Sequence, residues 1–178
     1  MNLNELISKI EQWAEDRNII KGSKPIDQAM KLFSEFGELA DNVGKGRDCR
    51  DDIGDCAVVI IIISKQLGIN VLDYKVDLGK PKNIKDEIAW LGYGITSELC
   101  TDSDTGKFDP DLRCEFKRLG LIAEYFGYTL EECLQIAYND IKDRKGILWN
   151  GVFVKSTDES YQEVLKMYQE SMEGNYRA

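Results

Sequence analysis

The run Cys56-Ala-Val-Val-Ile-Ile-Ile-Ile63 decides the fold of this chain. It is apolar at every position, and an α-helix that is apolar on all sides must be buried on all sides. A parallel β-strand is the alternative, because β-branched residues dominate the run. Length favours a helix, since the pattern extends over residues 49–67 and stops at Gly68, a residue typical of helix ends. The run therefore predicts a central buried helix.

The N-terminal side of this helix predicts two more helices. Residues 2–18 carry apolar side chains at helical spacing, and Gly22 and Pro25 end that pattern. Residues 25–43 begin at the proline, which suits the first position of a helix. We expect the apolar stripe of this second helix to face the core, and it consists of Ile26, Ala29, Met30, Phe33, Phe36, Gly37, Ala40 and Val43.

The C-terminal half predicts further helices and one hairpin. Thr129, with Glu132 three residues later, has the capping-box pattern of a helix start. Asn150-Gly151 lies between the apolar segments 147–149 and 152–154, which indicates a two-residue β-hairpin turn. Helices are expected over 84–100, 110–126 and 129–144, and another, capped by Thr157 or Asp158, runs to about residue 173.

The whole chain, 1–178, is expected to form one all-α domain with that small hairpin. A helical unit over 1–75 would be followed by a second one over 84–178. Residues 65–69 resemble residues 124–128 at a shift of 59 positions (128 minus 69), as in a degenerate repeat. In that register Asp55 falls on a cysteine, so the second unit would not keep the acidic pairs described below.

The composition excludes several classes of function. The formal net charge is −9, which repels a phosphate backbone and argues against a nucleic-acid partner. No histidine is present, so Ser-His-Asp catalysis and histidine-based zinc sites are excluded. The five cysteines are scattered and fit a reducing compartment. The apolar run is too short for a membrane span, so we expect a cytoplasmic protein with no membrane partner.

Two pairs of carboxylates predict a metal site. Glu35 and Glu38 lie on one face of the second helix, and Asp52 and Asp55 lie on one face of the third, each pair at i, i+3 spacing. The short connection predicts antiparallel neighbouring helices, so the pairs would face each other. Four clustered negative charges need a cation, and Mg²⁺ suits oxygen ligands, with Mn²⁺ as the alternative.

The spacing alone leaves an ordinary explanation open. Glu35 and Glu38 lie opposite the main apolar stripe, where solvated glutamates are usual. Asp52 and Asp55 near a helix start are also favoured by the helix dipole. Against this, Leu32 and Leu39 flank the acidic face, and the aspartates open the most buried helix of the chain.

Four segments carry a resemblance to a known family. Residues 28–40, with Glu35-Phe-Gly-Glu38, and residues 51–60, with Asp52-Ile-Gly-Asp55, resemble the signature of the MazG-like, all-α NTP pyrophosphatases, many of them phage-encoded. Residues 12–17 and 137–146 are also similar to segments of that family. The family usually has glutamate at the position of Asp52.

This resemblance implies a fold, an activity and a set of site residues. The fold would be a MazG-like helical bundle. The reaction would be metal-dependent hydrolysis of a nucleoside triphosphate between the α- and β-phosphates. Glu35, Glu38, Asp52 and Asp55 would bind the metal and form the catalytic centre, with Glu38 as proton acceptor. Substrate contacts would come from Trp13, Arg17, Gln28, Lys31, Lys142, Arg144 and Lys145.

Several of these substrate contacts have structural alternatives. Trp13 either stacks on a base or packs in the core. Lys31 either reaches a phosphate or forms an i, i+4 pair with Glu35. The basic cluster at 142–145 either neutralises pyrophosphate or complements the dipole at a helix C-terminus.

Other functions also stay open at this point. The related dimeric all-α dUTPases and dCTPases share the carboxylates and differ in base recognition. A helical interaction protein without catalysis is the alternative of a different class. Because the central helix needs much cover, either the second half of the chain or a second copy must supply it, and we expect a homodimer.

Overall fold

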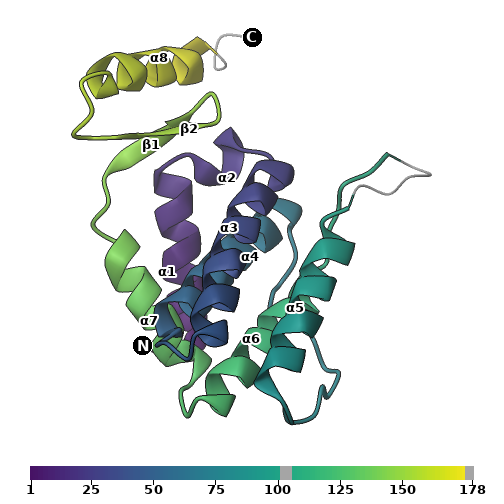
Figure 1. Ribbon diagram of the computed structural model, residues 1–178. Helices are drawn as coiled ribbons and strands as arrows, with labels where there is room; N and C mark the ends of the chain where they lie inside the picture. Colours follow the sequence, from purple (N-terminus) through teal and green to yellow (C-terminus); the bar gives the residue numbers. More distant parts are fainter. Residues whose placement is uncertain (101–105, 175–178) are drawn as a thin grey trace.

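The central helix predicted from the sequence is present. The computed structural model describes residues 1–100 and 106–174, and this part contains eight helices and one two-stranded antiparallel sheet (Figure 1). Helix α4 (Arg50–Leu67) is buried from Ile53 to Ser64 except at Asp55. Gly68 ends it in a left-handed conformation, with φ of 71°.

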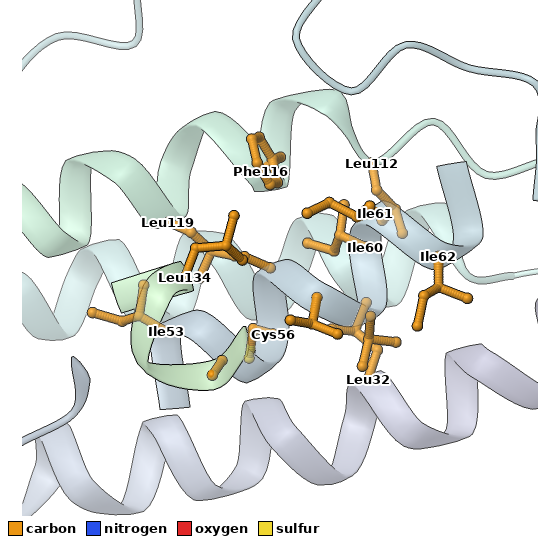
Figure 2. Packing of buried hydrophobic residues seen from close by; sticks show 14 of the residues in the cluster. Leu32, Ile53, Cys56, Ile60, Ile61, Ile62, Leu112, Phe116, Leu119 and Leu134 are labelled. Carbon is orange, nitrogen blue, oxygen red and sulfur yellow. The ribbon is translucent and has the colours of Figure 1, made fainter. Parts of the chain in front are cut away.

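The other helices surround α4, mostly where the sequence predicts them. Helix α4 packs against α1, α3, α6 and α7, and its isoleucines pack against α6 side chains such as Phe116 and Leu119 (Figure 2). The elements are α1 (Leu3–Asp16), α2 (Ile19–Gly22), α3 (Pro25–Gly44), α5 (Ile84–Glu98), α6 (Arg113–Tyr125), α7 (Leu130–Ile141), β1 (Gly146–Trp149), β2 (Val152–Lys155) and α8 (Tyr161–Gly174).

The boundaries differ from the prediction at two places that matter for the site. The first predicted helix stops at Asp16, and Asn18 adopts a left-handed conformation (φ 59°) that separates α1 from the single turn α2. Helix α7 has the predicted capping box at Thr129 but ends at Ile141 rather than at residue 144. Arg144 therefore lies in the connection that leads from α7 into the hairpin.

The hairpin is present with the predicted turn, and it is anchored to the helical core. Asn150 and Gly151 have φ of 48° and 79°, the positive values that a two-residue type I′ turn requires. The amide of Leu148 donates to the carbonyl of Arg17 at 2.8 Å, and the side-chain amide of Asn18 donates to the carbonyl of Leu148 at 2.9 Å. These bonds hold the hairpin over one end of the bundle, with α8 beyond it (Figure 1).

The expected orientation of α3 is only partly right, since Ala29 and Val43 of the predicted stripe are buried and Phe36 and Ala40 pack partly against the core. Its core-facing side carries Leu32, Glu35 and Leu39, all buried, whereas Met30 and Phe33 of the predicted stripe are exposed. The reason is that α4 is apolar on every side and can pack against any apolar surface. Leu32 and Leu39 supply that surface on the acidic side of α3, so Glu35 becomes buried between the helices, and the edge of the predicted stripe with Ile26, Met30 and Phe33 is exposed.

Of the two sources of cover expected for the central helix, the second half of the chain is the one present, and the homodimer stays a prediction. The cover that α4 needs comes from the same chain, because α6 and α7 pack on it together with α1 and α3. Exposure of the central helix is therefore no reason to expect a second copy.

The proposed repeat stays a prediction. No helix among the described residues combines the length and apolarity needed to cross a membrane.

Candidate active site

A cavity of about 410 Å³ opens between the helical core and the hairpin. Glu35 of α3 and Asp55 of α4 line it together with the cationic side chains of Lys31, Arg144 and Lys155. Its remaining wall is largely apolar and includes Trp13, Ile19, Val59, Ile62, Leu148 and Phe153. The cavity thus combines acidic groups, basic groups and an apolar surface, as a site for a charged organic ligand requires.

Glu35 is the most buried of the predicted site residues. It is 6% exposed, because its face of α3 packs against α4. A buried carboxylate needs a partner, and Lys31, one turn earlier on α3, forms an ion pair with it. The i, i+4 pair expected as the structural alternative for Lys31 is therefore present. Lys31 also lines the cavity, so the pair does not remove it from the site.

Asp55 enters the cavity from a tightly packed part of α4. A β-carbon at the preceding residue, Gly54, would lie 2.3 Å from the carbonyl oxygen of Cys133 on α7, so glycine permits the close contact of these helices. Burial, and then the charges of Asp51 and Glu35, raise the pKa of Asp55 to about 7. The acidic groups are thus close enough to repel one another.

Asp52 lies beside the cavity and has a polar partner. The side-chain amide of Asn42, on α3, donates to a carboxylate oxygen of Asp52 at 2.8 Å. Burial raises the pKa of Asp52 against the effect of this bond, and the charge of Glu35 raises it further. Burial also raises the pKa of Asp51, followed by the charges of Asp140 and Asp52.

All four predicted carboxylates lie near one buried thiol, that of Cys56 on α4. The pKa of this thiol is raised well above its usual value, first by burial and then by the charges of Glu35, Asp55, Asp52 and Glu38. Two packed helices therefore place both acidic pairs in one neighbourhood. Only two of the four line the cavity, since Glu38 is exposed on α3 and Asp52 is turned toward Asn42.

The side chains as they stand do not form a finished metal site. Within residues 1–100 and 106–174, no three acidic or cysteine side chains are grouped closely enough to hold a metal ion. Glu35 is directed to Lys31, and Asp52 to Asn42. Convergence of all four carboxylates on a single ion stays a prediction, and it requires these two acids to exchange their present partners for the ion.

The predicted basic cluster is divided by the structure. Arg144 lines the cavity, and Lys145 lines an adjoining groove of about 360 Å³ that shares Arg144, Phe153 and Lys155 with it. Lys142 lies outside both and donates to the side-chain oxygen of Asn139 at 3.0 Å. Of the three predicted cations, Arg144 is therefore the best placed to meet a ligand.

Arg17 holds the backbone next to the cavity through hydrogen bonds to three carbonyls. Its guanidinium donates to the carbonyls of Trp13, Lys142 and Arg144 at 3.1, 3.2 and 2.6 Å. Those carbonyls include the C-terminal end of α7, where cations are favoured. Arg17 does not line the cavity, so a direct contact with substrate is not supported by its position.

Trp13 and Gln28, two of the residues predicted to contact substrate, line the cavity. The indole nitrogen of Trp13 donates to the carbonyl of Ile141 at 2.8 Å, and the guanidinium of Arg17 lies 5.0 Å from the ring centre. Trp13 is half-buried. One part of its side chain packs on the core, and another part forms cavity wall. The side chain of Gln28 donates to the hydroxyl of Ser23 at 3.0 Å.

Several residues of the site were not predicted from the sequence. Asp51 adjoins Asp52, and the doubled aspartate was a signal that could have been used. Asn42 had no such signal, because it acts across the contact between two helices. Phe153 and Lys155 come from the hairpin, which is bonded to the link between α1 and α2 and packs against the core through Leu148.

Comparisons with known proteins give one informative relative. No family model matches the chain, and no solved structure matches it. It is 47% identical over 162 residues to the "Uncharacterized 18.2 kDa protein in rep-hol intergenic region" of Haemophilus phage HP1 (strain HP1c1), a match that covers 76% of this chain and 98% of the phage protein. The expected link to phage-encoded proteins is confirmed. The relative's name states no activity.

Proposed function

The chain belongs to the family of this phage HP1 protein, and we propose that it is a metal-dependent pyrophosphohydrolase that cleaves nucleoside triphosphates to nucleoside monophosphates and pyrophosphate. One observation carries the proposal. Glu35 and Asp55 share a cavity of about 410 Å³ with three cationic side chains and an apolar wall. A nucleoside triphosphate has the matching parts, namely a polyanion that binds divalent metal and an apolar base.

The acidic side of the cavity fits a hard divalent cation. Glu35 and Asp55 would hold Mg²⁺ or Mn²⁺, and Asp52 and Glu38, one helical turn from them, would complete the set. The mutual repulsion of these carboxylates fits a cation, because a bound cation would relieve it. When bound, the metal would accept phosphate oxygens and make water a better nucleophile at neutral pH.

The residues of the chain would share the remaining tasks. Lys31, Arg144 and Lys155 would neutralise the phosphates and the leaving pyrophosphate. Trp13 and Phe153 would hold the base against the apolar wall and exclude water from that side. Glu38 is exposed and would accept the proton of the attacking water if it is not used fully as a metal ligand.

The sequence resemblance to MazG-like enzymes supports the same activity. The two acidic motifs lie on α3 and α4, which pack against each other. The segment 137–146, also part of that resemblance, supplies Arg144 to the same cavity. Two motifs that are about 90 positions apart in the sequence (144 minus 55 is 89) therefore contribute to one site.

The test is turnover of a panel of common ribo- and deoxyribonucleoside triphosphates with Mg²⁺, with both products measured. We expect pyrophosphate and monophosphate in equal amounts. Reaction in ¹⁸O-labelled water identifies the phosphorus attacked, because the label enters the monophosphate when attack is at the α-phosphate. Activity restricted to dUTP or dCTP would assign the related dimeric all-α class. Absence of turnover for every nucleotide would favour a helical interaction protein and reject the proposal.

A further inference from the structure

Helices α3 and α4 run antiparallel along the cavity, and a hydrogen bond joins them near each end. The side chain of Asn42, near the end of α3, donates to that of Asp52, near the start of α4, at 2.8 Å. The side-chain amide of Gln66, near the end of α4, donates to the hydroxyl of Ser23, just before α3, at 3.0 Å. Residues at equal distances from the two ends therefore lie opposite each other.

This arrangement gives the cavity an acidic end and a neutral end. Gln28 precedes Glu35 on α3, and Ile62 follows Asp55 on α4, in both cases by seven residues (35 minus 28 and 62 minus 55). At 1.5 Å per residue, Gln28 and Ile62 lie roughly 10 Å from the carboxylates along the helix axes. The inference that follows rests on the proposed function, which puts metal and phosphates at the acidic end. The nucleoside then extends toward Gln28.

Gln28 is the lining side chain suited to read the edge of a base. Among the described residues that line the cavity, every other side chain is charged, apolar or absent, as in glycine, except that of Trp13. The indole N–H of Trp13 is already bonded to the carbonyl of Ile141 at 2.8 Å. A base in this cavity therefore has the amide of Gln28 as its neutral hydrogen-bonding partner.

Ser23 fixes which end of that amide is free. The hydroxyl of Ser23 has one proton and donates it to the carbonyl of Ile19 at 2.7 Å. It can therefore only accept from the amide groups of Gln28 and Gln66, both at 3.0 Å. The nitrogen of Gln28 is thus held at Ser23, and its oxygen accepts no hydrogen bond within the described part of the chain.

Gln66 holds Ser23 in place and has the same orientation. Its nitrogen donates to the carbonyl of Ser23 at 3.0 Å as well as to the hydroxyl, and a carbonyl can only accept. Its oxygen is buried and has no hydrogen-bond partner in residues 1–100 and 106–174. Gln66 lies one helical turn beyond Ile62, so both glutamines leave an oxygen without a partner near the neutral end.

We propose that Gln28 selects nucleotides whose base carries an amino group at the edge away from the sugar, as cytosine and adenine do. The free oxygen of Gln28 accepts a hydrogen bond from that amino group. Uracil, thymine and guanine carry a carbonyl oxygen there, which would face the oxygen of Gln28 with no proton between them. Gln28 is then the specificity residue of the cavity, and Ser23 is the residue that positions it.

The first experiment measures binding rather than turnover. The full chain with Mg²⁺ is titrated calorimetrically with the α,β-methylene analogues of dCTP and dUTP, which cannot be cleaved between the α- and β-phosphates. We expect the dCTP analogue to bind about tenfold more tightly or better. The dATP analogue should likewise bind more tightly than the dGTP analogue. Gln28→Leu should bring the dCTP and dUTP analogues to within about twofold of each other, because no acceptor is left.

Ser23→Ala tests the positioning role, because it frees the amide of Gln28 to turn over. The nitrogen can then donate to the carbonyl of uracil, so the preference should shrink through tighter binding of the dUTP analogue. A merely structural role of Ser23 would weaken both analogues alike. Ser8→Ala is the matched control, since the hydroxyl of this exposed serine also donates to a carbonyl one turn earlier, that of Asn4 at 2.9 Å. It should keep the wild-type preference.

Three results would overturn the inference. They are equal binding of the dCTP and dUTP analogues by the wild type, a preference that Gln28→Leu leaves intact, and equal weakening of both analogues in Ser23→Ala. Failure of the proposed function looks different. In that case the wild type would bind the analogues with the expected preference and yet release no pyrophosphate from dCTP.

Discussion

Glu35 and Glu115 are buried to nearly the same degree, at 6% and 4% exposed, yet their surroundings differ. Glu35 has Lys31 beside it and a cavity in front of it. Glu115, on α6, is pressed against α5, where a β-carbon at Gly94 would lie 2.1 Å from one of its oxygens. Its other oxygen has no hydrogen-bond partner in the described structure.

The difference shows what makes a buried carboxylate a candidate for chemistry. Burial, followed by the charge of Glu98, raises the pKa of Glu115, and the nearby Arg118 lowers it only in part. Arg118 is itself paired with Glu87. Glu115 thus has a raised pKa but does not line the cavity, whereas Glu35 lines it together with a cation and a second carboxylate, that of Asp55. Space and opposing charge distinguish the two sites better than burial does.

The largest expected effect is on nucleotide turnover, and it is tested by making the same substitution at Glu35 and, in a separate variant, at Glu115. Glu35→Gln should lower nucleotide turnover about 10²–10³-fold, because it removes a charge that would hold the metal. Glu115→Gln, the matched control, should stay within about twofold of wild type. Steady-state assays of pyrophosphate release measure both. Equal losses in the two variants would mean that burial alone, through stability, explains the effect.

Metal binding also separates the cavity site from Glu115, and it can be measured without turnover as a change in thermal stability. Mg²⁺ in about hundredfold excess over its dissociation constant should stabilise the folded chain by about 2.7 kcal/mol, since it binds only the folded site. Differential scanning fluorimetry should show this as a rise in Tm. Asp55→Asn should abolish the rise, and Glu115→Gln should retain it. A rise that survives in Asp55→Asn would place the metal elsewhere.

The hairpin covers the cavity beside Glu35, which allows a third comparison. Lys155→Ala should weaken substrate use about tenfold in kcat/KM, mainly through KM, because a phosphate contact on the cavity wall is lost. Lys166→Ala on the exposed face of α8 is the matched control and should change nothing. A loss confined to kcat would contradict a role in binding the ground state.

The smallest effect concerns stability and pH at Glu115. Its folded-state pKa lies above its ordinary 4.5, so unfolding releases its proton between these two values. The free energy of unfolding therefore falls as pH rises through this window, and the loss is complete above the folded-state pKa. Glu115→Gln should remove this loss and be more stable than wild type by about 1 kcal/mol at neutral pH, but not at pH near 4. Urea unfolding at several pH values measures the difference, and a constant difference would contradict it.

Local patterns in the sequence were sufficient for most of the fold. The apolar run of α4, the capping box at Thr129 and the turn at Asn150-Gly151 each appear where predicted. Their information lies within a few residues, because helix periodicity, caps and tight turns are properties of short segments. The two acidic pairs were visible for the same reason.

Tertiary structure alone decided which face of α3 is buried and what completes the site. The apolar count favoured the stripe with Met30 and Phe33, but packing chose the side with Leu32, because α4 accepts any apolar partner and only one face of α3 can contact it. Asn42, Phe153 and Lys155 lie beside the acidic groups through contacts between different helices and strands. A sequence pattern shows which side chains share a helix face, whereas the competition among faces for one core is settled only when all the elements pack together.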